Sequence, residues 1–566
     1  MPDRLHKIYS NDYADFMIDY SGNASALNKY ESDSVSVINY FFAVAHLPVS
    51  ELTEDVISRK GYAPIPSVFG LISELSLESS GILRIRSLPN FDLRGKGVLI
   101  GIVDSGIDYT NPIFQYADKT TKIAAIWDQN ILNEKTQDGI MYGTEYSREQ
   151  INEALKSDKP LEVVPSKDEI GHGTMVAGIA AGNEVPASGF YGVAPDAELL
   201  IVKLKPAKPN LKQFFRIPQS AVAYQESDID FGIQYVLSYA AKVNKPVILC
   251  VACDTSQYAH DGRGSTSGWL SLQATMPGIG IVMAVGNEGN ARRHYLGKIT
   301  DADKPDTVEL NVGANEEGFS MELWGISPNT FSIDITTPSG EYISRIDIHF
   351  SESREITFIF EPTIIHIDYQ MVESQSGDQL ILLRFTNPTQ GIWKFNVYGR
   401  GLFPMTFDIW LPMNNFVGPD TFFVRSDAST TLLSLSCSIA PISVTAYNIE
   451  DESLFLDSGR GFTRIQIVKP DIAAPGVNIV APTVNGGFAE VTGTSAAVAH
   501  TAGVAAMLME WGIVKGNYPR MSTQDMKTFM IRGARRKQDT TYPNRDWGYG
   551  ILDIYRVFDE IRSEGQ

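Results

Sequence analysis

The sequence predicts an α/β protein whose parallel-sheet core is preceded by a small α+β unit and interrupted by an all-β insertion. Two observations predict the core: continuous apolar runs that end at a polar residue or a glycine, and helical segments between them. A third observation predicts the insertion, because residues 300–412 change to short alternating runs separated by turn signals. The chain of 566 residues has room for a large core and further units.

The N-terminal unit mixes β-rich and helical patterns. Residues 7–19 and 34–47 are apolar and β-branched with partial alternation, which predicts strands. Residues 66–79 carry apolar side chains at helical spacing before Gly81, so a helix is predicted there. Its apolar positions are Val68, Leu71, Ile72 and Leu75. Residues 82–94 are predicted to be an extended connector.

The core strands are predicted from buried apolar runs separated by helices. The run 97–104 is apolar on both faces and ends at Asp104. The other predicted strands are 197–204, 246–253, 280–285 and 442–447, and the predicted helices are 147–156, 227–243, 496–511 and 523–533. Such an alternation implies a doubly wound sheet, whose chemistry lies at the carboxyl ends of the strands.

The insertion is predicted to be a β-sandwich or jelly roll, and it carries no nucleophile candidate in a convincing setting. The predicted division of the chain is 1–88 for the N-terminal unit, 89–299 for the first part of the core, 300–413 for the insertion and 414–566 for the second part of the core.

Composition excludes several classes of protein. The net charge of −20, without a Lys/Arg cluster among aromatic residues, argues against a nucleic-acid partner. Three cysteines are too few for a disulfide framework, and Cys250 and Cys253 lie in one predicted buried strand, on opposite faces. Residues 1–10 lack the apolar segment of a signal peptide, and no run predicts a membrane span. Non-classical export stays open.

Ser495 stands in front of a long uncharged helical run. Small neighbours let a backbone approach its hydroxyl, and the N-terminal amides of the predicted helix 496–511 would face a charge developing there. Taken alone, a Gly-Thr-Ser turn that caps an apolar helix is the simpler explanation. An acid and a histidine elsewhere in the chain favour a nucleophile.

Three more polar residues lie at element ends. Asp104 lies at the end of a predicted buried strand, where it is either a functional carboxylate or an ordinary turn residue. His172 lies between Gly171 and Gly173 before a helix of small residues, which is more specific than a lone histidine. Asn287 follows the predicted strand 280–285, where its amide could donate to an oxyanion or simply form a turn.

A serine nucleophile needs a base, and the base needs an acid that holds its tautomer. The chain order Asp104, His172, Ser495 is that of subtilisin, and the absence of G-x-S-x-G around Ser495 disfavours an α/β-hydrolase. The motifs around these residues resemble the subtilisin family (subtilases) of serine proteases. They are Val103-Asp104-Ser105-Gly106, Gly171-His172-Gly173-Thr174, Gly286-Asn287, Lys469-Pro470-Asp471-Ile472-Ala473-Ala474-Pro475-Gly476 and Gly493-Thr494-Ser495-Ala496.

The resemblance covers about residues 99–533 apart from the insertion, and implies a subtilisin-like fold that hydrolyses peptide bonds in polypeptide substrates through an acyl-enzyme. Ser495 would be the nucleophile, His172 the general base and then acid, and Asp104 the residue that orients His172. The amide of Asn287 and the backbone N–H of Ser495 would hold the oxyanion.

Within the family, the chain resembles the Csp-type subtilases of clostridia, whose known members act in spore germination and carry a prodomain and a jelly-roll insert. The matching residues are Trp127-Asp128-Gln129, Val202-Lys203-Leu204-Lys205 and His260-Asp261-Gly262. This resemblance implies that residues 1–88 are a prodomain that assists folding and stays at the cleft as an inhibitor, in a cytoplasmic or spore-associated protein. We predict autocleavage within the connector 82–89, lying across the cleft as a tethered product.

The substrate pocket is predicted from Ala252, Cys253, Asp254 and Gly286. Asp254 falls where the pocket wall of the family commonly has glycine. Facing the cleft, its carboxylate would favour a basic P1 residue, the residue before the cleaved bond; the alternative is that Asp254 turns outward. Ala499 stands where many subtilases have proline, away from the catalytic atoms.

The chemistry requires no cofactor. Structural calcium is compatible with the family, but the sequence assigns no ligands to it. Two alternatives to a protease remain: a non-catalytic sensor or scaffold, and a serine esterase or amidase for small substrates.

Overall fold

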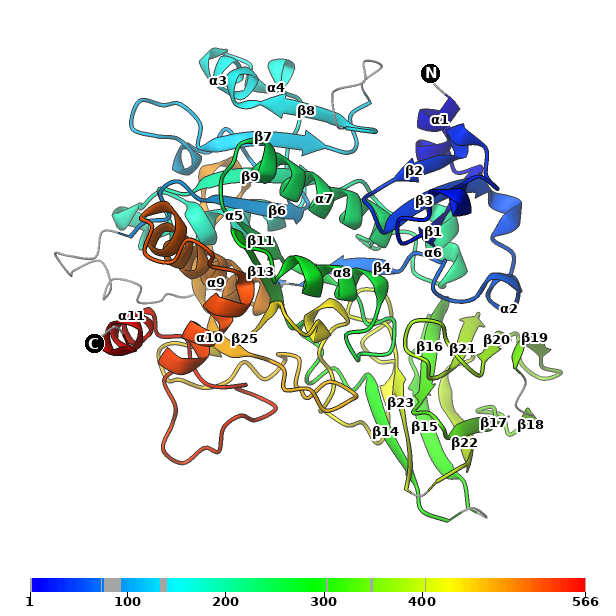
Figure 1. Ribbon diagram of the computed structural model, residues 1–566. Coiled ribbons are helices and arrows are strands. Elements are labelled where there is room, and N and C mark those ends of the chain that lie inside the picture. The colour runs from blue at the N-terminus through cyan, green and yellow to red at the C-terminus, as the bar shows by residue number, and fades with distance from the viewer. Residues whose placement is uncertain are drawn as a thin grey trace.

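The computed structural model describes residues 3–72, 74–75, 93–132, 140–301, 304–346, 350–402 and 404–564. Figure 1 shows three parts: a central sheet with helices on both faces, an N-terminal unit beside it in blue, and a β-sandwich below in green and yellow. The N-terminal unit contacts both other parts, because its Tyr62 and Ser67 bond residues of the sandwich and of the core respectively.

The central sheet has eight strands in the order β26-β25-β13-β11-β6-β9-β7-β8, and all neighbours except β7 and β8 are parallel. The predicted parallel-sheet core is therefore confirmed. The strands are β6 (Leu99–Asp104), β7 (Ile123–Asp128), β8 (Thr144–Ser147), β9 (Glu198–Lys203), β11 (Val247–Val251), β13 (Ile279–Ala284), β25 (Ile442–Asn448) and β26 (Ile472–Val477).

Both faces of the sheet are buried, which explains the continuous apolar runs. In β6, Ile100 and Ile102 join the apolar cluster of α5 (His172–Ala181) and α9 (Thr494–Met509). Leu99 and Val103 join the cluster of α7 (Glu226–Lys242) and α8 (Ser265–Gln273) on the opposite face. The remaining helices of the core are α3 (Arg148–Lys156), α4 (Pro160–Val163), α6 (Pro209–Phe214), α10 (Thr523–Gly533) and α11 (Ile554–Glu564).

Cys250 and Cys253 lie in the two different clusters, and both are buried, free thiols. This is the opposite-face placement that the sequence predicts.

One helix of the described chain, Thr494–Val514, has the length and apolar composition of a membrane span, although no such run is predicted from the sequence. Of its apolar window, 78% is buried inside the protein, where α9 packs on β11, β13, β25 and β26. The run is therefore accounted for as a core helix.

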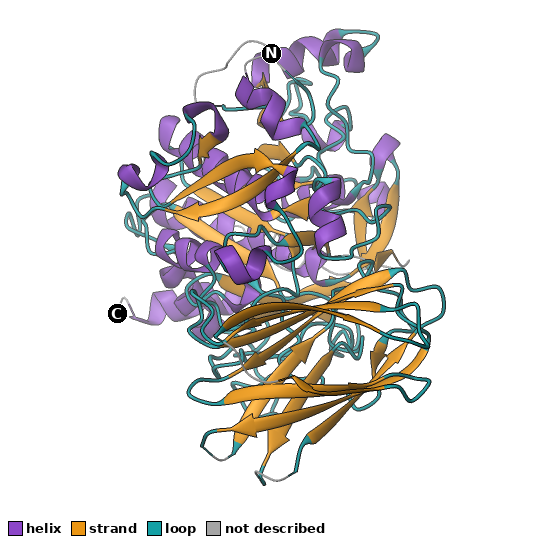
Figure 2. Cartoon of the chain, turned by 90° about the vertical axis from the view of Figure 1, so that its right-hand side faces the viewer, coloured by secondary structure: helices purple, strands orange, loops and turns teal. Residues whose placement is uncertain are grey.

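The inserted region forms two facing antiparallel sheets (Figure 2). One has the order β14-β23-β16-β21-β20-β19 and the other β18-β17-β22-β15-β24. The strands are β14 (His294–Ile299), β15 (Asp306–Val312), β16 (Gly318–Gly325), β17 (Thr330–Thr336), β18 (Tyr342–Ile346), β19 (Ser351–Thr357), β20 (Ile364–Gln370), β21 (Gln379–Thr386), β22 (Gly391–Arg400), β23 (Met405–Trp410) and β24 (Phe422–Phe423).

The predicted limits of the insertion, 300 and 413, need correction. β14 begins at His294 and pairs along its whole length with β23, and β24 pairs with β15 beyond residue 413. Both segments belong to the sandwich because each forms an edge strand of one of its two sheets.

The N-terminal unit has a three-stranded sheet in the order β1-β3-β2. Its elements are α1 (Asp3–Tyr9), β1 (Tyr13–Asp19), β2 (Val35–Val37), β3 (Phe42–Pro48), α2 (Val56–Lys60), β4 (Val68–Leu71) and β5 (Glu74–Leu75). Residues 7–9 are therefore helical, and the strand predicted over 7–19 begins only at Tyr13.

The helix predicted over 66–79 is wrong where the chain is described. Residues 68–71 form β4, and 74–75 form β5. β4 pairs with core strands on both sides, so distant partners override the local helical spacing. The predicted connector 82–89 lies outside the described residues.

Candidate active site

The structure brings Asp104, His172 and Ser495 together from β6, α5 and α9. The Nδ1 atom of His172 lies 2.8 and 2.9 Å from the two carboxylate oxygens of Asp104. Its Nε2 atom lies 3.0 Å from the Oγ atom of Ser495. All three side chains are buried. This geometry allows a proton to pass from the serine to the imidazole while the carboxylate holds the opposite ring nitrogen.

Two glycines let the histidine segment approach the aspartate segment. A β-carbon added at Gly173 would lie 2.2 Å from the carbonyl oxygen of Gly106, so any other residue would push α5 off the loop after β6. Gly171 precedes α5 with a φ of 93°, in the left-handed region that favours glycine. The Gly-His-Gly motif thus positions the imidazole next to Asp104.

Asp168 fixes the loop that leads into α5, a role that our sequence analysis missed. Its carboxylate accepts hydrogen bonds from the Ser105 hydroxyl at 2.9 Å, the Gly171 N–H at 2.7 Å and the Thr174 N–H at 2.9 Å. It therefore ties the loop after β6 to the start of the histidine helix. An aspartate just before a glycine and a helix is a capping signal that could have identified it.

Asp168 and Asp104 also affect the pKa of His172. Burial lowers the pKa of His172, but the Asp104 carboxylate beside it and the Asp168 carboxylate raise it, and the net pKa lies above the ordinary value of 6.5. A more basic imidazole is a better proton acceptor for the serine.

Asn287 lies at the start of the serine helix. Its Oδ1 atom accepts hydrogen bonds from the backbone N–H and the hydroxyl of Thr494, both at 3.1 Å. With its oxygen fixed in this way, the amide nitrogen of Asn287 is the group left to donate elsewhere. The N–H of Ser495 lies in the first turn of α9, where backbone donors have no helical acceptor. Both are N–H donors of the kind that an oxyanion site uses.

The N-terminal unit occupies the cleft beside these residues. β4 pairs antiparallel with β10 (Tyr224–Gln225) on one side and with β12 (Cys253–Asp254) on the other. Directly after β4, the carbonyl oxygen of Ile72 accepts a hydrogen bond from the Ser495 hydroxyl. Further along, β5 pairs with β28 (Phe488–Thr492). An extended polypeptide therefore passes Ser495 with paired strands on both sides.

A cavity of about 640 Å³ opens beside the same segment. Leu71 and His172 line it together with Val222, Phe416 and Pro482. The two residues before Ile72, Gly70 and Leu71, thus have open space next to His172.

The predicted pocket residues lie close to this segment, but Asp254 does not face it. The Asp254 carboxylate accepts N–H groups of Thr255, Leu435 and Ser436 at 2.7 to 3.1 Å and is buried. Burial raises the pKa of Asp254 to about 7, although these N–H groups lower it. The expectation of a basic P1 residue is therefore corrected, because the carboxylate is committed to the loop at 435–436.

The other three predicted pocket residues contact the segment or its surroundings. Cys253 pairs through its backbone with Leu71, and the carbonyl oxygen of Ala252 lies 3.5 Å from Ser495 Oγ. Gly286 has a φ of 92°, and a β-carbon there would meet Leu433 at 2.5 Å. Leu433 and Ile72 both belong to the large apolar cluster of the core.

The cofactor predictions stay open. Among the described residues, no group of three or more His, Cys, Asp or Glu side chains is arranged to hold a metal ion. The triad chemistry itself uses only the side chains described above.

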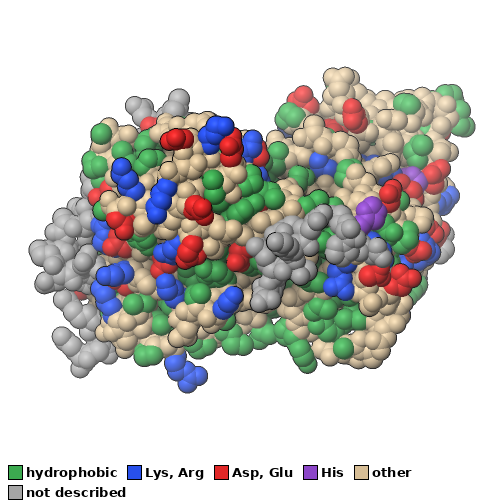
Figure 3. Space-filling view, turned by 90° about the horizontal axis from the view of Figure 1, so that it is seen from above, with side chains coloured by type: hydrophobic (Ala, Val, Ile, Leu, Met, Phe, Trp, Pro, Cys, Tyr) green, Lys and Arg blue, Asp and Glu red, His purple; other side chains and the backbone are tan. Residues whose placement is uncertain are grey.

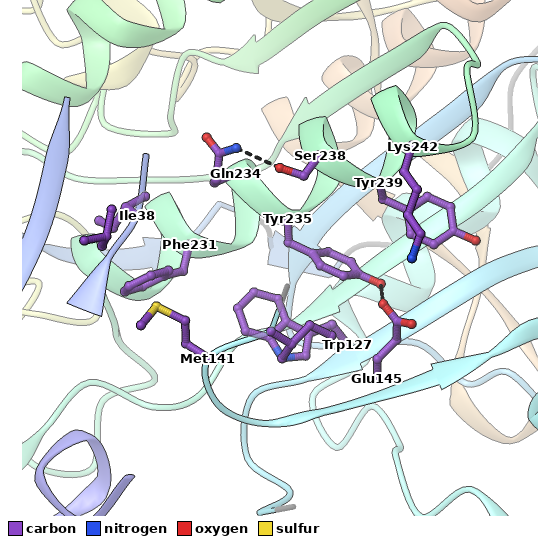
Figure 4. A pocket seen from close by; sticks show the side chains of 12 residues that line it. Ile38, Trp127, Met141, Glu145, Phe231, Gln234, Tyr235, Ser238, Tyr239 and Lys242 are labelled. Carbon is purple, nitrogen blue, oxygen red and sulfur yellow. Dashed lines mark hydrogen bonds between the residues drawn. The ribbon is translucent and has the colours of Figure 1, made fainter. Parts of the chain in front are cut away.

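A separate cavity of about 160 Å³ lies between β7, β8, α7 and the N-terminal unit. Figure 4 shows Trp127 and Tyr235 at its wall, with the Tyr235 hydroxyl donating to Glu145 at 2.7 Å. None of the triad residues lines this cavity. On the face seen in Figure 3, acidic and basic side chains are interspersed, without the basic surface that nucleic acid would need.

Known proteins resemble this chain in sequence and in fold. The model of the subtilase family (Peptidase_S8) matches residues 95–412 and 413–550. The structure of the CspB protease of Clostridium perfringens is similar, with a TM-score of 0.75 and 29% sequence identity, over 84% of this chain and 95% of that chain.

Two curated relatives are more distant in sequence. The PIII-type proteinase of Lactococcus lactis subsp. cremoris (strain SK11) is 23% identical over 547 residues, which cover 84% of this chain and 26% of that proteinase. The subtilisin-like protease SBT3.17 of Arabidopsis thaliana is 23% identical over 485 residues, covering 81% of this chain and 59% of that protease. The chain thus spans about a quarter to three-fifths of their length. Because the family model matches well over half of the chain, this protein belongs to the subtilase family of serine proteases.

Proposed function

We propose that the protein is a serine endopeptidase that cleaves its own chain after Ile72 and then retains residues 1–72 as an inhibitor. The observation that carries this proposal is the hydrogen bond between the Ser495 hydroxyl and the carbonyl oxygen of Ile72, in a segment paired with β10 and β12. This contact puts the Ser495 hydroxyl next to the carbonyl group of Ile72, whose carbon the nucleophile would attack.

The chemistry follows from the distances at Ser495. His172 Nε2 takes the hydroxyl proton as Ser495 Oγ bonds to the carbonyl carbon of Ile72. The oxygen of Ile72 becomes an oxyanion, which the Asn287 amide and the Ser495 N–H stabilise. His172 then protonates the amine of residue 73, and the C–N bond breaks. Water hydrolyses the resulting acyl-enzyme, with His172 as the base once more.

This proposal moves the cleavage site upstream of the connector 82–89, in which the sequence analysis expects it. The reason is the register of β4: Cys253 pairs with Leu71 and Asp254 with Gly70, which leaves Ile72 next to Ser495. The new site makes a testable distinction, because the two sites give fragments of different mass.

Retention of the N-terminal unit is supported by its buried polar contacts with the core. Lys208 Nζ donates to the Asp15 carboxylate at 2.8 Å and to the carbonyl oxygen of Tyr13 at 3.3 Å. The Ser67 N–H donates to Glu226 at 3.0 Å. These contacts lie outside the cleaved bond and would survive cleavage. They would leave Ser495 covered, so activity on another polypeptide requires release of the unit.

Intact mass of the purified protein tests the proposal. We expect the wild-type chain to give two species, residues 1–72 and 73–566, that elute together in gel filtration, and Ser495→Ala to give one uncleaved species. A wild-type chain that stays whole after incubation, or a Ser495→Ala chain cut at the same bond, would overturn it. The same masses would identify a cut within 82–89.

A fluorophosphonate label separates the protease from the alternatives. We expect a Ser495-dependent adduct after release of residues 1–72. Folded, processed protein that takes no label would favour a sensor or scaffold, and labelled protein active on small esters but on no polypeptide would favour an esterase. The germination role implied by the Csp-type resemblance stays a prediction for a later substrate search.

A further inference from the structure

The cleft approaches the bound segment closely at one position that carries no side chain. Counted back from the bond after Ile72, Leu71 occupies P2 and Gly70 occupies P3. A β-carbon added at Gly70 would lie 3.0 Å from both Sδ and Cε of Met413 and 3.3 Å from Cζ of Phe416. The φ of Gly70 lies outside the left-handed region, so glycine is not needed there for its backbone freedom. It is needed for space.

Met413 and Phe416 lie in the connection from the sandwich back to the core, after β23. Both are buried, with exposed fractions of 3% each. Figure 1 shows β4 between the core and the sandwich. We call Met413 and Phe416 the P3 roof.

The P3 roof is held by residues next to the oxyanion site. The N–H of Asn414 donates to Glu288 Oε1 at 3.0 Å, and Arg293 donates to Asn414 Oδ1 at 2.8 Å. The amide of Asn414 also donates to the backbone carbonyl of Asn287 at 3.4 Å. Glu288 and Arg293 are themselves paired at 3.2 Å and buried. Moving the roof would therefore disturb the residues beside Asn287.

Gly70, at P3, and Leu71, at P2, both line the cavity of about 640 Å³ beside His172, as does Phe416. The close approach at P3 is therefore local: it lies along the direction of the β-carbon, where Met413 and Phe416 stand, and open space lies beside it.

We propose that the P3 roof makes this enzyme selective for polypeptides with glycine at P3, two residues before the residue whose carbonyl is attacked. This inference rests on the proposed function. The Cε and Sδ atoms of Met413 are the end of a flexible side chain, so they can yield a few tenths of an ångström to alanine. A larger side chain would have to displace Met413 and Phe416 before it reached the cavity, and the hydrogen bonds of Asn414 that hold the connection oppose this displacement.

Self-cleavage of the full-length chain tests the proposal. We expect cleavage after Ile72 to slow about three- to tenfold in Gly70→Ala and about a hundredfold or more in Gly70→Leu, since overpacking here opposes the bound geometry. Adding Met413→Ala to Gly70→Leu opens the roof and should restore the rate at least about tenfold. Gly268→Ala is the matched control, because a β-carbon at Gly268 in α8 meets no described atom within 4 Å outside its own helix turn; its cleavage rate should stay at the parent value.

A second measurement uses processed wild-type protein from which residues 1–72 have been released, and so avoids any folding defect of the variants. Peptides of sequence Val-Phe-Xaa-Leu-Ile-Ser, with Gly, Ala, Val or Leu at Xaa, should show kcat/KM falling in that order. Equal kcat/KM for the four peptides would overturn glycine selectivity while leaving the protease intact. The role of the P3 roof would be overturned by a Gly70→Leu chain that cleaves itself at the parent rate. It would also be overturned if Gly70→Leu cleaves more slowly and Met413→Ala does not restore the rate. Failure of the parent chain to cleave at all would instead overturn the proposed function.

Discussion

The described part of the molecule contains two buried hydrogen-bond chains of Ser, His and Asp, and their distances are nearly the same. In the candidate active site, Ser495 Oγ lies 3.0 Å from His172, whose Nδ1 lies 2.8 Å from Asp104. In the N-terminal sheet, Ser36 Oγ lies 2.8 Å from His46 Nε2, and His46 Nδ1 lies 2.6 Å from Asp15. The distances within a Ser-His-Asp hydrogen-bond chain therefore do not distinguish a catalytic triad from a structural one.

The surroundings of the two serines separate them. Ser495 begins a 16-residue helix, beside Asn287, and contacts a peptide carbonyl. Ser36 lies inside the short strand β2, fully buried, without a helix start at its hydroxyl. Because Ser36 lies inside a strand and not at a helix start, we interpret the hydrogen-bond chain of Ser36, His46 and Asp15 as structural.

The two aspartates also differ in their partners. Asp104 accepts from His172 and from the N–H of Ser105. Asp15 accepts from His46, from Lys208 Nζ at 2.8 Å and from Gln225 Nε2 at 2.7 Å. Burial raises the pKa of Asp15, but Lys208 and His46 lower it by more, so that its pKa lies below the usual range. Asp15 thus anchors the N-terminal unit to the core.

The largest expected difference comes from the two aspartates. Asp104→Asn should slow cleavage after Ile72 by about 10⁴-fold, because an amide does not hold the histidine tautomer that accepts the serine proton. Asp15→Asn should change the same rate by less than about threefold, since it touches no reacting atom. Rates come from intact mass against time, on proteins shown to be folded by circular dichroism. If both variants lost cleavage rate to a similar extent, the distinction between a catalytic and a structural hydrogen-bond chain would be wrong.

The next effect concerns the ion pair that Asp15 makes with Lys208. Lys208→Met leaves a buried carboxylate without its ammonium, which should lower the free energy of unfolding by about 3–5 kcal/mol. The double variant Lys208→Met with Asp15→Asn removes both charges and should recover most of this loss. Urea unfolding in a Ser495→Ala background measures it without cleavage.

Lys159→Met is the control for this ion pair, because Lys159 and Glu162 form an exposed pair with side-chain exposures of 71% and 68%. Its effect should stay below about 0.5 kcal/mol. If the single variant at Lys208 is as stable as the parent, the N-terminal unit is held by its other contacts alone.

A smaller effect appears in the pH dependence of self-cleavage. The pKa of His172 is raised above 6.5, so the imidazole is protonated below that pKa and does not accept the Ser495 proton. The rate should therefore rise about tenfold per pH unit as pH increases toward the pKa of His172 and level off above it. A rate that is flat between about pH 5 and 8 would show that His172 is not the base. Circular dichroism at each pH checks that the fold is unchanged.

The sequence carries the core and the triad in local patterns. Apolar runs with both faces buried mark β6 and β11, and Gly171 and Gly173 mark the place where α5 packs against the loop at Gly106. These signals are local because each of these residues lies at the end of the strand or helix that positions it.

The bound segment and the direction of Asp254 could not be predicted in the same way. Four apolar residues at 68, 71, 72 and 75 suit a helix as well as a strand, and the partners that decide, β10 and β12, lie more than 150 residues away. Asp254 is turned away from the cleft by N–H groups at 435–436, beyond the whole insertion. Contacts between residues so far apart in the sequence produce no periodic pattern of apolar residues.

The smallest expected effect comes from replacing the two serines. This comparison is the most direct, because each substitution removes the same Oγ atom from one of the two hydrogen-bond chains. Ser36→Ala deprives His46 of one hydrogen-bond partner and should lower the free energy of unfolding by about 1–3 kcal/mol, without changing the rate of cleavage after Ile72. Ser495→Ala should abolish cleavage and leave stability near the parent value. Urea unfolding and intact mass on the two variants give both quantities. If Ser36→Ala slowed cleavage as much as it lowered stability, the N-terminal chain would be coupled to the active site, and the division into a catalytic and a structural triad would fail.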